Sequence, residues 1–537
     1  MPTELLQRVR SAPLILIATV LAVGCDATSR SPADSAVSTL LIRDVRIVSP
    51  ERSAPFDNAW VLVRGERIEA LGQGTPPVAG PAVEVIEGRG RFLTPGLIDG
   101  HVHLVAVPGL DLRQVEERAD LTAAYYQQLP RSYLYFGFTT LVDLNLIYPR
   151  VLDGFSGPGP HPEVVHCGGG VSVANGYPMS YLPEESRFEI FSNFLWLESQ
   201  APSIPSRFAA EDHTPERVVR RIVEGGGACV KSFWEEGFGP TPELPTPGEA
   251  LMGEVLAEAR HRGVPLLLHA NSLPAHEFAA RVGVDAVAHG LWNWGPGAGE
   301  EPIGAEPPSR IREVLDREID ASVAYMPSLQ VMAGLAGLLD PEFLNEPRLR
   351  DVIPPGLLEW YRGDEGQWFV EELLEGEAPA PVRRAMEEVG RQGERALKYF
   401  SENGGRVLFG SDTPSSPTFA NPPGLNGFWE LERMDGAGLS PSAVMRAATL
   451  ENARFFGLAD DVGTIQVGKK AHLLLLSANP LEAVAAWDSI EKIVVAGEVV
   501  GRDQLSLLSG PGSGRSGGEG PAMAFPTRRS GQRFRRR

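Results

Sequence analysis

Two stretches near the start of the chain alternate apolar and polar side chains, as strands with one buried face do. They run from Leu40 to Val48 and from Ala59 to Leu71. The same alternation returns near the other end, over residues 462–467, 471–476 and 490–500. Because both ends of the chain carry this pattern, we predict one small sheet domain assembled from residues 39–92 and 459–505.

Between these ends, short apolar runs alternate with stretches whose apolar residues recur at helical spacing, which is typical of parallel βα units. Thr214-Pro215 and Ser440-Pro441 each place a capping side chain before a proline, which predicts a helix start. Eight candidate strands end near His103, Leu144, Cys167, Phe233, Ala270, Gly290, Ser328 and Asp412. Eight such units within residues 93–458 predict an α/β fold with one (β/α)8 barrel.

Two connections in this region are too long for a plain crossover. They run from Gly168 to Asp212, where Tyr177 lies, and from Leu329 to Arg406. Each follows a predicted strand, so each begins on the carboxyl face of the barrel, where active sites lie. Whether they line a substrate pocket or are structural additions stays open.

Charge narrows the function classes. The 537 residues carry a formal net charge of −20, which argues against nucleic acid as a partner. The hydrophobic content of 43% is ordinary for a globular protein. Lysine is scarce, so Lys231 stands out inside the apolar run that ends at Phe233.

The N-terminus predicts export. Arg8 and Arg10 precede an apolar run from Leu14 to Val23, which is too short to span a bilayer, since that takes about 20 residues. Small residues followed by Cys25 resemble the lipobox of bacterial lipoproteins. We therefore expect a signal peptide over 1–24, a lipidated Cys25 and a tether over 25–38. The protein would then be a membrane-anchored lipoprotein on the periplasmic side, with an ordinary signal peptide as the alternative.

At the other end, residues 506–537 are rich in Gly, Ser and Arg, and we expect a disordered basic tail. Cys167 and Cys229 occupy small apolar positions in predicted strands, and we expect two buried, unpaired thiols. Three histidines, His213, His261 and His276, fall in or beside predicted helices, where we expect them to be solvated.

His101 and His103 carry the first sign of chemistry. Side chains at positions i and i+2 of a strand share one face, so both imidazoles can reach one metal ion. The pair follows directly on the segment TPGLIDG at 94–100. The whole motif, TPGLIDGHVH, resembles the opening motif of the amidohydrolase superfamily, and within it the imidazolonepropionase-like and prolidase-like members.

The resemblance implies a distorted, TIM-like (β/α)8 barrel with a small β-sandwich domain formed from both ends of the chain. It also implies a set of metal ligands at the ends of successive strands. The matching positions here are His101, His103, Lys231, His269, His289 and Asp412. The segment GTIQVGKKAHL at 463–473 is similar to the closing motif of the family, although His472 stands where aspartate is usual. The resemblance covers roughly Leu40 to Val500.

The implied cofactor is a pair of divalent metal ions, with Zn²⁺ expected and Mn²⁺, Fe²⁺ or Co²⁺ also suited to these ligands. Lys231 would bridge them as N6-carboxylysine, since an ammonium group cannot ligate a metal. Pairing of Lys231 with Glu235 or Glu236 is the structural alternative. Metal-bound hydroxide would attack an amide, and Asp412 would serve as general base and acid.

The expected substrate is a small molecule, either a dipeptide of Xaa-Pro type or a cyclic amide. Two alternatives stay open: a mononuclear deaminase or imidazolone-type ring hydrolase, and an inactive substrate-binding lipoprotein. The membrane would be reached only through the N-terminal lipid, and a homo-oligomer is not excluded. Candidate substrate contacts at the carboxyl face are His166, Tyr177, Asn271 and Trp292.

Overall fold

A computed structural model describes residues 38–237, 243–295, 306–415 and 417–509. The predicted signal peptide, Cys25 and the tether up to residue 37 lie outside the described residues, as do residues 510–537 of the predicted tail. The first tail residues are ordered, because Ser506 donates a hydrogen bond to Asp351 at 2.5 Å and residues 507–509 form a short 3-10 helix. Within the described residues, no helix has both the length and the apolar character needed to cross a membrane.

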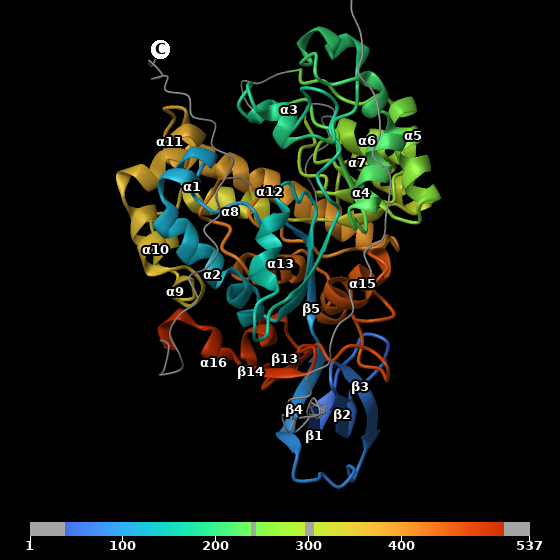
Figure 1. Cartoon of the computed structure of the whole chain (residues 1–537), viewed down its shortest axis with the longest axis vertical. Coiled ribbons are helices and arrows are strands. Elements are labelled where there is room, and N and C mark those ends of the chain that lie inside the picture. The colour runs from blue at the N-terminus through green and yellow to red at the C-terminus, as the bar shows by residue number, and fades with distance from the viewer. Residues whose placement is uncertain (1–37, 238–242, 296–305, 416, 510–537) are drawn as a thin grey trace, which may run out of the picture. The chain divides into compact units, whose positions relative to one another are not determined.

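Both ends of the chain contribute to one seven-stranded sheet (Figure 1). Strand β4 is its centre, pairing in parallel with β1 and antiparallel with β12, from Phe92 opposite Leu476 to Pro95 opposite Leu473. The sheet order is β14-β13-β12-β4-β1-β2-β3. The bounds are β1 Thr39–Ile47, β2 Phe56–Arg64, β3 Arg67–Gln73, β4 Val83–Pro95, β12 Leu473–Leu476, β13 Ile490–Val495 and β14 Glu498–Gly501.

This sheet matches the domain expected from the two alternating segments, with one error. No strand forms over 462–467, where the chain makes turns instead. Backbone groups beside this segment bond to the β2–β3 turn region, as in the bond from the Ala471 amide to the Glu66 carbonyl at 2.7 Å. The described strands from the two chain ends form a single sheet, so the β-sandwich arrangement stays a prediction.

The middle of the chain forms two parallel sheets. One has the order β5-β6-β7 and the other β11-β10-β9-β8. Every residue of these strands except those of β7 is buried, as expected for strands covered on both faces. The bounds are β5 Leu97–Val102, β6 Phe138–Asp143, β7 Glu163–His166, β8 Val230–Phe233, β9 Leu266–His269, β10 Ala286–Ala288 and β11 Ala324–Met326.

The two parallel sheets are joined by isolated bridges. Val171 bridges to Ser232 of β8, which connects the segment after β7 to the four-stranded sheet. On the other side, Val407 bridges to Tyr325 of β11 and Thr413 bridges to Val102 of β5. The predicted eighth strand is therefore an extended segment with bonds to both neighbours, and it carries Asp412 between them.

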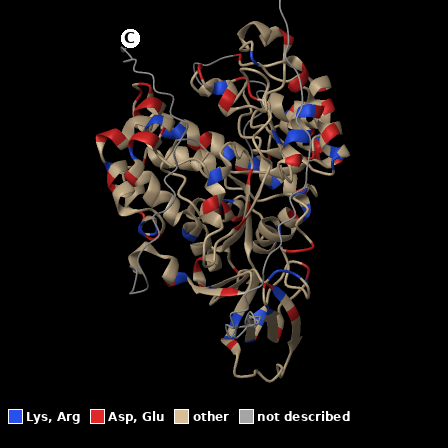
Figure 2. Cartoon of the chain, viewed as in Figure 1, with Lys and Arg blue, Asp and Glu red and all other residues tan. Residues whose placement is uncertain are grey.

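Helices connect the strands and cover these sheets (Figure 1). Thr214 and Ser440 cap α4 and α14 as predicted, each accepting a backbone hydrogen bond ahead of a proline at the first turn. The bounds are α1 Leu112–Glu117, α2 Ala119–Tyr135, α3 Arg187–Ile190, α4 Pro215–Glu224, α5 Glu249–His261, α6 Leu273–Val282, α7 Ser309–Asp320, α8 Gln330–Leu338, α9 Leu349–Val352, α10 Pro355–Arg362, α11 Trp368–Leu374, α12 Pro379–Glu402, α13 Leu425–Gly436, α14 Pro441–Arg446, α15 Asn452–Phe455 and α16 Arg502–Leu505. Acidic and basic residues are interspersed along them (Figure 2).

Cys167 and Cys229 form a disulfide, so the expectation of two unpaired thiols was wrong. Cys167 directly follows β7 and Cys229 directly precedes β8, and their Cα atoms lie 4.4 Å apart, within the range that a disulfide spans. The neighbouring amide of Ala228 bonds to the carbonyl of His166 at 2.8 Å. The bond thus joins the two parallel sheets at their seam.

Two histidines expected in solvent are buried instead. His276 on α6 is fully buried, with Nδ1 2.8 Å from Glu318 of α7 and Nε2 3.1 Å from the Ala270 carbonyl. His213 stacks on Phe194, with ring centroids 3.7 Å apart. Both lie at contacts between elements distant in sequence, which helical spacing alone does not reveal. His261 is exposed, as expected.

Candidate metal centre

The six predicted ligands come together at the carboxyl ends of the parallel strands. His101 and His103 lie at the end of β5, Lys231 is in β8, His269 ends β9, His289 follows β10, and Asp412 follows the extended eighth segment. All are buried except His103, whose side chain keeps 22% of its surface exposed. The short spacing between each strand and its ligand is what directs these side chains to one place.

His101, His103 and Asp412 form the tightest group. The Nε2 atoms of both histidines lie 3.0 Å from the same oxygen of Asp412, Oδ1. Ligand atoms from the three residues all lie within 4.8 Å of one another, a spacing that suits a common metal ion. This is one candidate metal position.

His269 and His289 form a second pair beside the first group. Nδ1 of His269 lies 3.1 Å from Nε2 of His289. The His289 ring centroid is 5.1 Å from that of His101, and its Nδ1 lies 3.7 Å from Oδ2 of Asp412. Asp412 therefore stands between the two groups of histidines, which is the arrangement needed for two neighbouring ions.

Lys231 is 1% exposed and has no carboxylate partner among the described residues. Its Nζ lies 3.5 Å from the Ala288 carbonyl and 5.8 Å from the centroid of the Phe233 ring. Burial lowers the pKa of Lys231 to about 7, against the attraction of Asp412. The alternative pairing with Glu235 or Glu236 is absent, so the amine is held close to neutral.

The backbone around Asp412 is held by a network of buried polar groups. Asp412 has a positive φ of 53°, and its amide donates to the His101 carbonyl at 2.8 Å. Before it, the Ser411 hydroxyl donates to Asp99 at 2.5 Å and its amide donates to the same carboxyl at 3.0 Å. After it, the Asn426 amide group donates to the Thr413 hydroxyl at 2.8 Å. These bonds hold Asp412 in a left-handed backbone conformation, which costs free energy for residues other than glycine.

Gly410 allows the close approach of the eighth segment to β5. A Cβ added to Gly410 would lie 2.4 Å from the Met326 sulfur and 2.7 Å from Cβ of His101. Asn452 of α15 ties the same two segments together. Its Nδ2 donates to the carbonyls of Ile98 and Phe409 at 2.9 and 2.8 Å, and its Oδ1 accepts from the Phe409 amide at 3.1 Å.

The electrostatics suit a cation. Burial lowers the pKa of His101 to about 3 and lowers those of His269 and His289, so these imidazoles are neutral at neutral pH. Burial also opposes ionisation of Asp412, but the interactions with His101 and His289 outweigh it and hold its pKa well below the usual value. The buried Nδ1 atoms of His101 and His289 have no hydrogen-bond partner. Neutral imidazole nitrogens around a carboxylate are the ligands that zinc prefers, so these residues fit a metal.

The four predicted substrate contacts differ in their placement. The Tyr177 ring lies 4.7 Å from that of His269, and the Trp292 ring lies 5.0 Å from that of His289. Asn271 is buried beside His269. His166 instead accepts a bond from the Gly168 amide at 3.1 Å within its own turn, and within the described part of the chain it makes no hydrogen bond or ion pair to a predicted ligand. Their roles in substrate binding stay predictions.

Sequence analysis missed Glu235 as a residue of the site. It is 7% exposed and contacts His269 and Asn271. It follows β8 by two residues, so its position on the carboxyl face of the predicted barrel could have marked it as a residue of the site.

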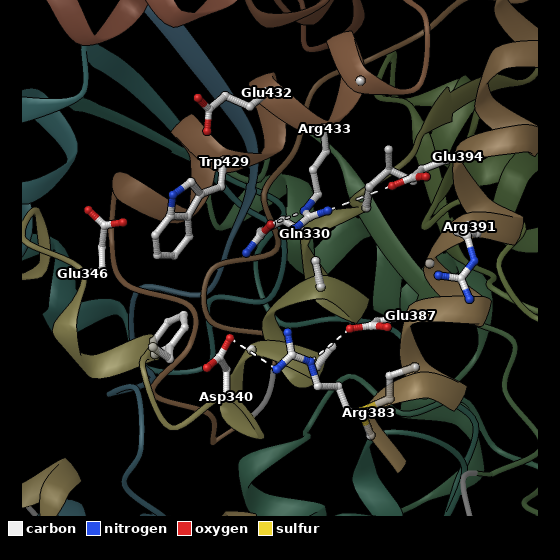
Figure 3. A pocket seen from close by; sticks show the side chains of 18 of the residues that line it. Gln330, Asp340, Glu346, Arg383, Glu387, Arg391, Glu394, Trp429, Glu432 and Arg433 are labelled. Atoms are coloured by element: carbon white, nitrogen blue, oxygen red, sulfur yellow. Dashed lines mark hydrogen bonds and ion pairs between the residues drawn. The ribbon is translucent and has the colours of Figure 1, made fainter. Parts of the chain in front are cut away.

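A separate cavity of about 840 Å³ lies between α8, α12 and α13 (Figure 3). Its charged side chains are largely paired with one another, as Arg383 is with Asp340 and Glu387. None of the predicted ligands or substrate contacts lines it.

Comparison with known proteins agrees with this geometry. The amidohydrolase family profile matches residues 380–500. The imidazolonepropionase of Methylobacterium sp. (strain 4-46) is 27% identical over 269 residues, which cover 46% of this chain and 64% of the relative. The C-terminal part of the chain thus matches the amidohydrolase family, and imidazolonepropionases are among its relatives. An adenine deaminase of Rubrobacter xylanophilus is 39% identical over 67 residues, which are 12% of this chain and 11% of the relative. The matches thus span less than two thirds of these curated relatives.

Solved structures share the fold. An amidohydrolase aligns with a TM-score of 0.61 at 20% identity, over 86% of this chain and 99% of that chain. A Xaa-Pro dipeptidase with bound methionine aligns with a TM-score of 0.57 at 19% identity, over 86% and 100%. Molinate hydrolase aligns with a TM-score of 0.61 at 17% identity, over 92% and 98%. Identities this low speak to the fold alone.

Proposed function

We propose that this protein is a metal-dependent hydrolase that cleaves a carbon–nitrogen bond with an activated water. The observation that supports the proposal is that histidines lie beside both carboxylate oxygens of Asp412. His101 and His103 face its Oδ1 at 3.0 Å each. Nδ1 of His289 lies 3.7 Å from its Oδ2, and the other ring nitrogen of His289 lies 3.1 Å from His269. Four histidines, a lysine and an aspartate in this place do not serve packing, since burying apolar residues of similar volume would cost less free energy.

We propose that the bound ions are two Zn²⁺, with Mn²⁺, Fe²⁺ or Co²⁺ as alternatives. They would lower the pKa of bound water to about 7. The imidazoles of His101, His103, His269 and His289 would hold the ions through their ring nitrogens. Asp412 takes a proton from the attacking water and gives it to the leaving nitrogen. The buried setting excludes bulk water and strengthens each of these interactions.

Lys231 fits a role as N6-carboxylysine. With a pKa of about 7 it is roughly half neutral at pH 7, whereas an ordinary lysine is neutral in only about one molecule in 2,500. A neutral amine attacks carbon dioxide, forming a carbon–nitrogen bond and releasing one proton to give an anionic carbamate. Incubation with ¹³C-bicarbonate should give a carbamate carbon signal in the wild type that is missing in Lys231→Met.

The two parallel sheets support a distorted (β/α)8 barrel. Bridges connect Val171 to β8 on one side, and connect the eighth segment to β11 and β5 on the other. We infer that the sheets are the two halves of one barrel, and that the seven-stranded sheet corresponds to the small β-sandwich domain of such proteins.

The substrate we favour is a dipeptide of Xaa-Pro type or a cyclic amide. Structural neighbours named Xaa-Pro dipeptidase and prolidase, and relatives named imidazolonepropionase, support this choice. A mononuclear deaminase or imidazolone-type ring hydrolase is the second candidate, favoured by the adenine deaminase matches. A binding lipoprotein without catalysis would keep the donors and show no turnover.

The deciding experiment is metal analysis of purified protein joined to a hydrolysis screen over dipeptides, lactams and aminopurines. We expect about two ions per chain and turnover of an amide. One ion with deaminase activity would favour the second candidate, and a loaded protein inert across the screen would refute catalysis. His261→Gln is the control variant, since His261 is exposed and lies outside the site.

Export and anchoring also remain proposals. We propose that Cys25 carries a lipid and that the protein sits on the periplasmic face of a bacterial membrane. Labelling of cells with a fatty-acid analogue should mark the wild type and leave Cys25→Ala unmarked, and equal labelling would contradict the anchor.

A further inference from the structure

Glu235 places a buried carboxylate at the edge of the metal centre. It lies just after β8, and only 7% of its surface is exposed. Its Oε1 accepts a hydrogen bond from the Gly237 amide at 3.0 Å, and its Oε2 accepts one from Nδ2 of Asn271 at 3.2 Å. Oε2 also lies 3.5 Å from Nε2 of His269. No lysine or arginine pairs with it in the described parts of the chain, so its interactions are those of the site.

His269 presents its two ring nitrogens to different partners. Nδ1 lies 3.1 Å from Nε2 of His289, on the side of the candidate metal position, and Nε2 lies toward Glu235. The Tyr177 ring, 4.7 Å away, packs against the imidazole. By contrast, the Nδ1 atoms of His101 and His289 are buried without a hydrogen-bond partner. The carboxylate beside His269 is Glu235, whereas the carboxylate beside His101 and His289 is the predicted ligand Asp412.

A carboxylate at the distal nitrogen of a ligating histidine has two effects. It keeps the proton on that nitrogen, which leaves a lone pair on the other nitrogen for the metal, and it fixes the plane of the ring. Asn271 contacts both groups, because its Nδ2 donates a hydrogen bond to Oε2 of Glu235 at 3.2 Å, which holds the carboxylate in place, and lies 3.4 Å from Nε2 of His269. Loss of such a partner typically weakens metal binding 10–100-fold.

We propose that Glu235 is a positioning residue that orients His269 for the metal position shared with His289, while the position at His101, His103 and Asp412 does not depend on it. This inference rests on the proposed two-metal centre. It assigns separate support to each half: Glu235 and Asn271 for one, and the Asp412 backbone network for the other. The two metal positions should then differ in their response to a change at residue 235.

The test is a Zn²⁺ titration of the metal-free full chain against a chromophoric chelator, with bound zinc counted by elemental analysis. Wild type should bind two equivalents. Glu235→Leu should bind the first with unchanged affinity and the second roughly 10–100-fold more weakly. Asn271→Ala should show a smaller loss in the same equivalent. Glu236→Gln is the matched control, because Glu236 is the exposed neighbour and should behave as wild type.

The outcomes separate the inference from the function on which it rests. Two equivalents in wild type, with the second unchanged in Glu235→Leu, would overturn the assignment of Glu235 and leave the two-metal centre standing. An increase in KM without a change in zinc binding would also overturn it, and would point to contact with a cationic substrate group. A wild-type chain that binds one equivalent refutes both. Thermal unfolding of each variant shows whether it is folded, and Glu235→Gln, which keeps the volume, replaces Glu235→Leu if the latter is not.

Discussion

The disulfide between Cys167 and Cys229 makes a quantitative prediction about stability. The bond closes a loop of 62 residues in the unfolded chain. Loop-closure entropy for that length is worth about 4 kcal/mol at 25 °C. Since the bond also joins the two parallel sheets, opening it should release the seam between β7 and β8 first.

The perturbation is the replacement of both cysteines by alanine in a Cys25→Ala chain. Both half-cystines are fully buried, so alanine avoids placing a hydroxyl group in the core. The free energy of unfolding should fall by about 4 kcal/mol relative to the oxidised parent, as measured by urea denaturation followed by tryptophan fluorescence. The reduced parent separates the cross-link from the lost sulfur volume, because it keeps both side chains.

Two results would refute this account. A thiol assay on the unfolded, unreduced Cys25→Ala parent should find no free thiol, and two thiols would show that the bond does not form. If the bond forms but oxidised and reduced parents differ by less than about 1 kcal/mol, the entropic argument fails, and residual structure in the unfolded chain would be the explanation to test.

Three further predictions concern other buried polar groups. Asn452→Leu removes the side-chain hydrogen bonds to the Ile98 carbonyl and to the Phe409 amide and carbonyl, although the Phe409 carbonyl still accepts from the Gly100 amide at 3.2 Å. It should cost about 1–3 kcal/mol in urea denaturation, whereas Asn403→Leu at an exposed helix end should cost little. Asp412→Asn should lower kcat by about 10²–10⁴-fold with little change in thermal midpoint, and near-full turnover would exclude Asp412 as the proton carrier. Burial raises the pKa of Glu430 from 4.5 to about 7. Between these pH values the folded state therefore binds one proton more than the unfolded state. The contribution of Glu430 to the free energy of unfolding is highest below pH 4.5, and it is lost as the pH rises toward 7. Relative to Glu430→Gln, wild type should lose about 3 kcal/mol across that window, and parallel pH profiles would contradict the shift.

Much of the candidate metal centre could be predicted from the sequence, because the predicted ligands follow local patterns. His101 and His103 share a strand face by their spacing alone, and His269, His289 and Asp412 each follow a short apolar run. Parallel strands bring their carboxyl ends to one edge, so residues in these positions converge, and the resemblance to the amidohydrolase superfamily implied which of them are ligands. The sheet built from both chain ends was accessible for a similar reason, since alternation marks strands wherever they occur.

Other features depended on contacts that no local pattern records. The pairing of Cys167 with Cys229, the burial of His276 against Glu318 and the absence of a strand at 462–467 all follow from how distant segments pack. The same holds for Glu235, whose role comes from its distance to His269 rather than from its place in a motif. Strand periodicity and ligand order are properties of neighbouring residues, and the chain alone determined them. Which carboxylate faces which imidazole, and which thiols meet, are properties of positions far apart in the sequence, and only the tertiary structure decided them.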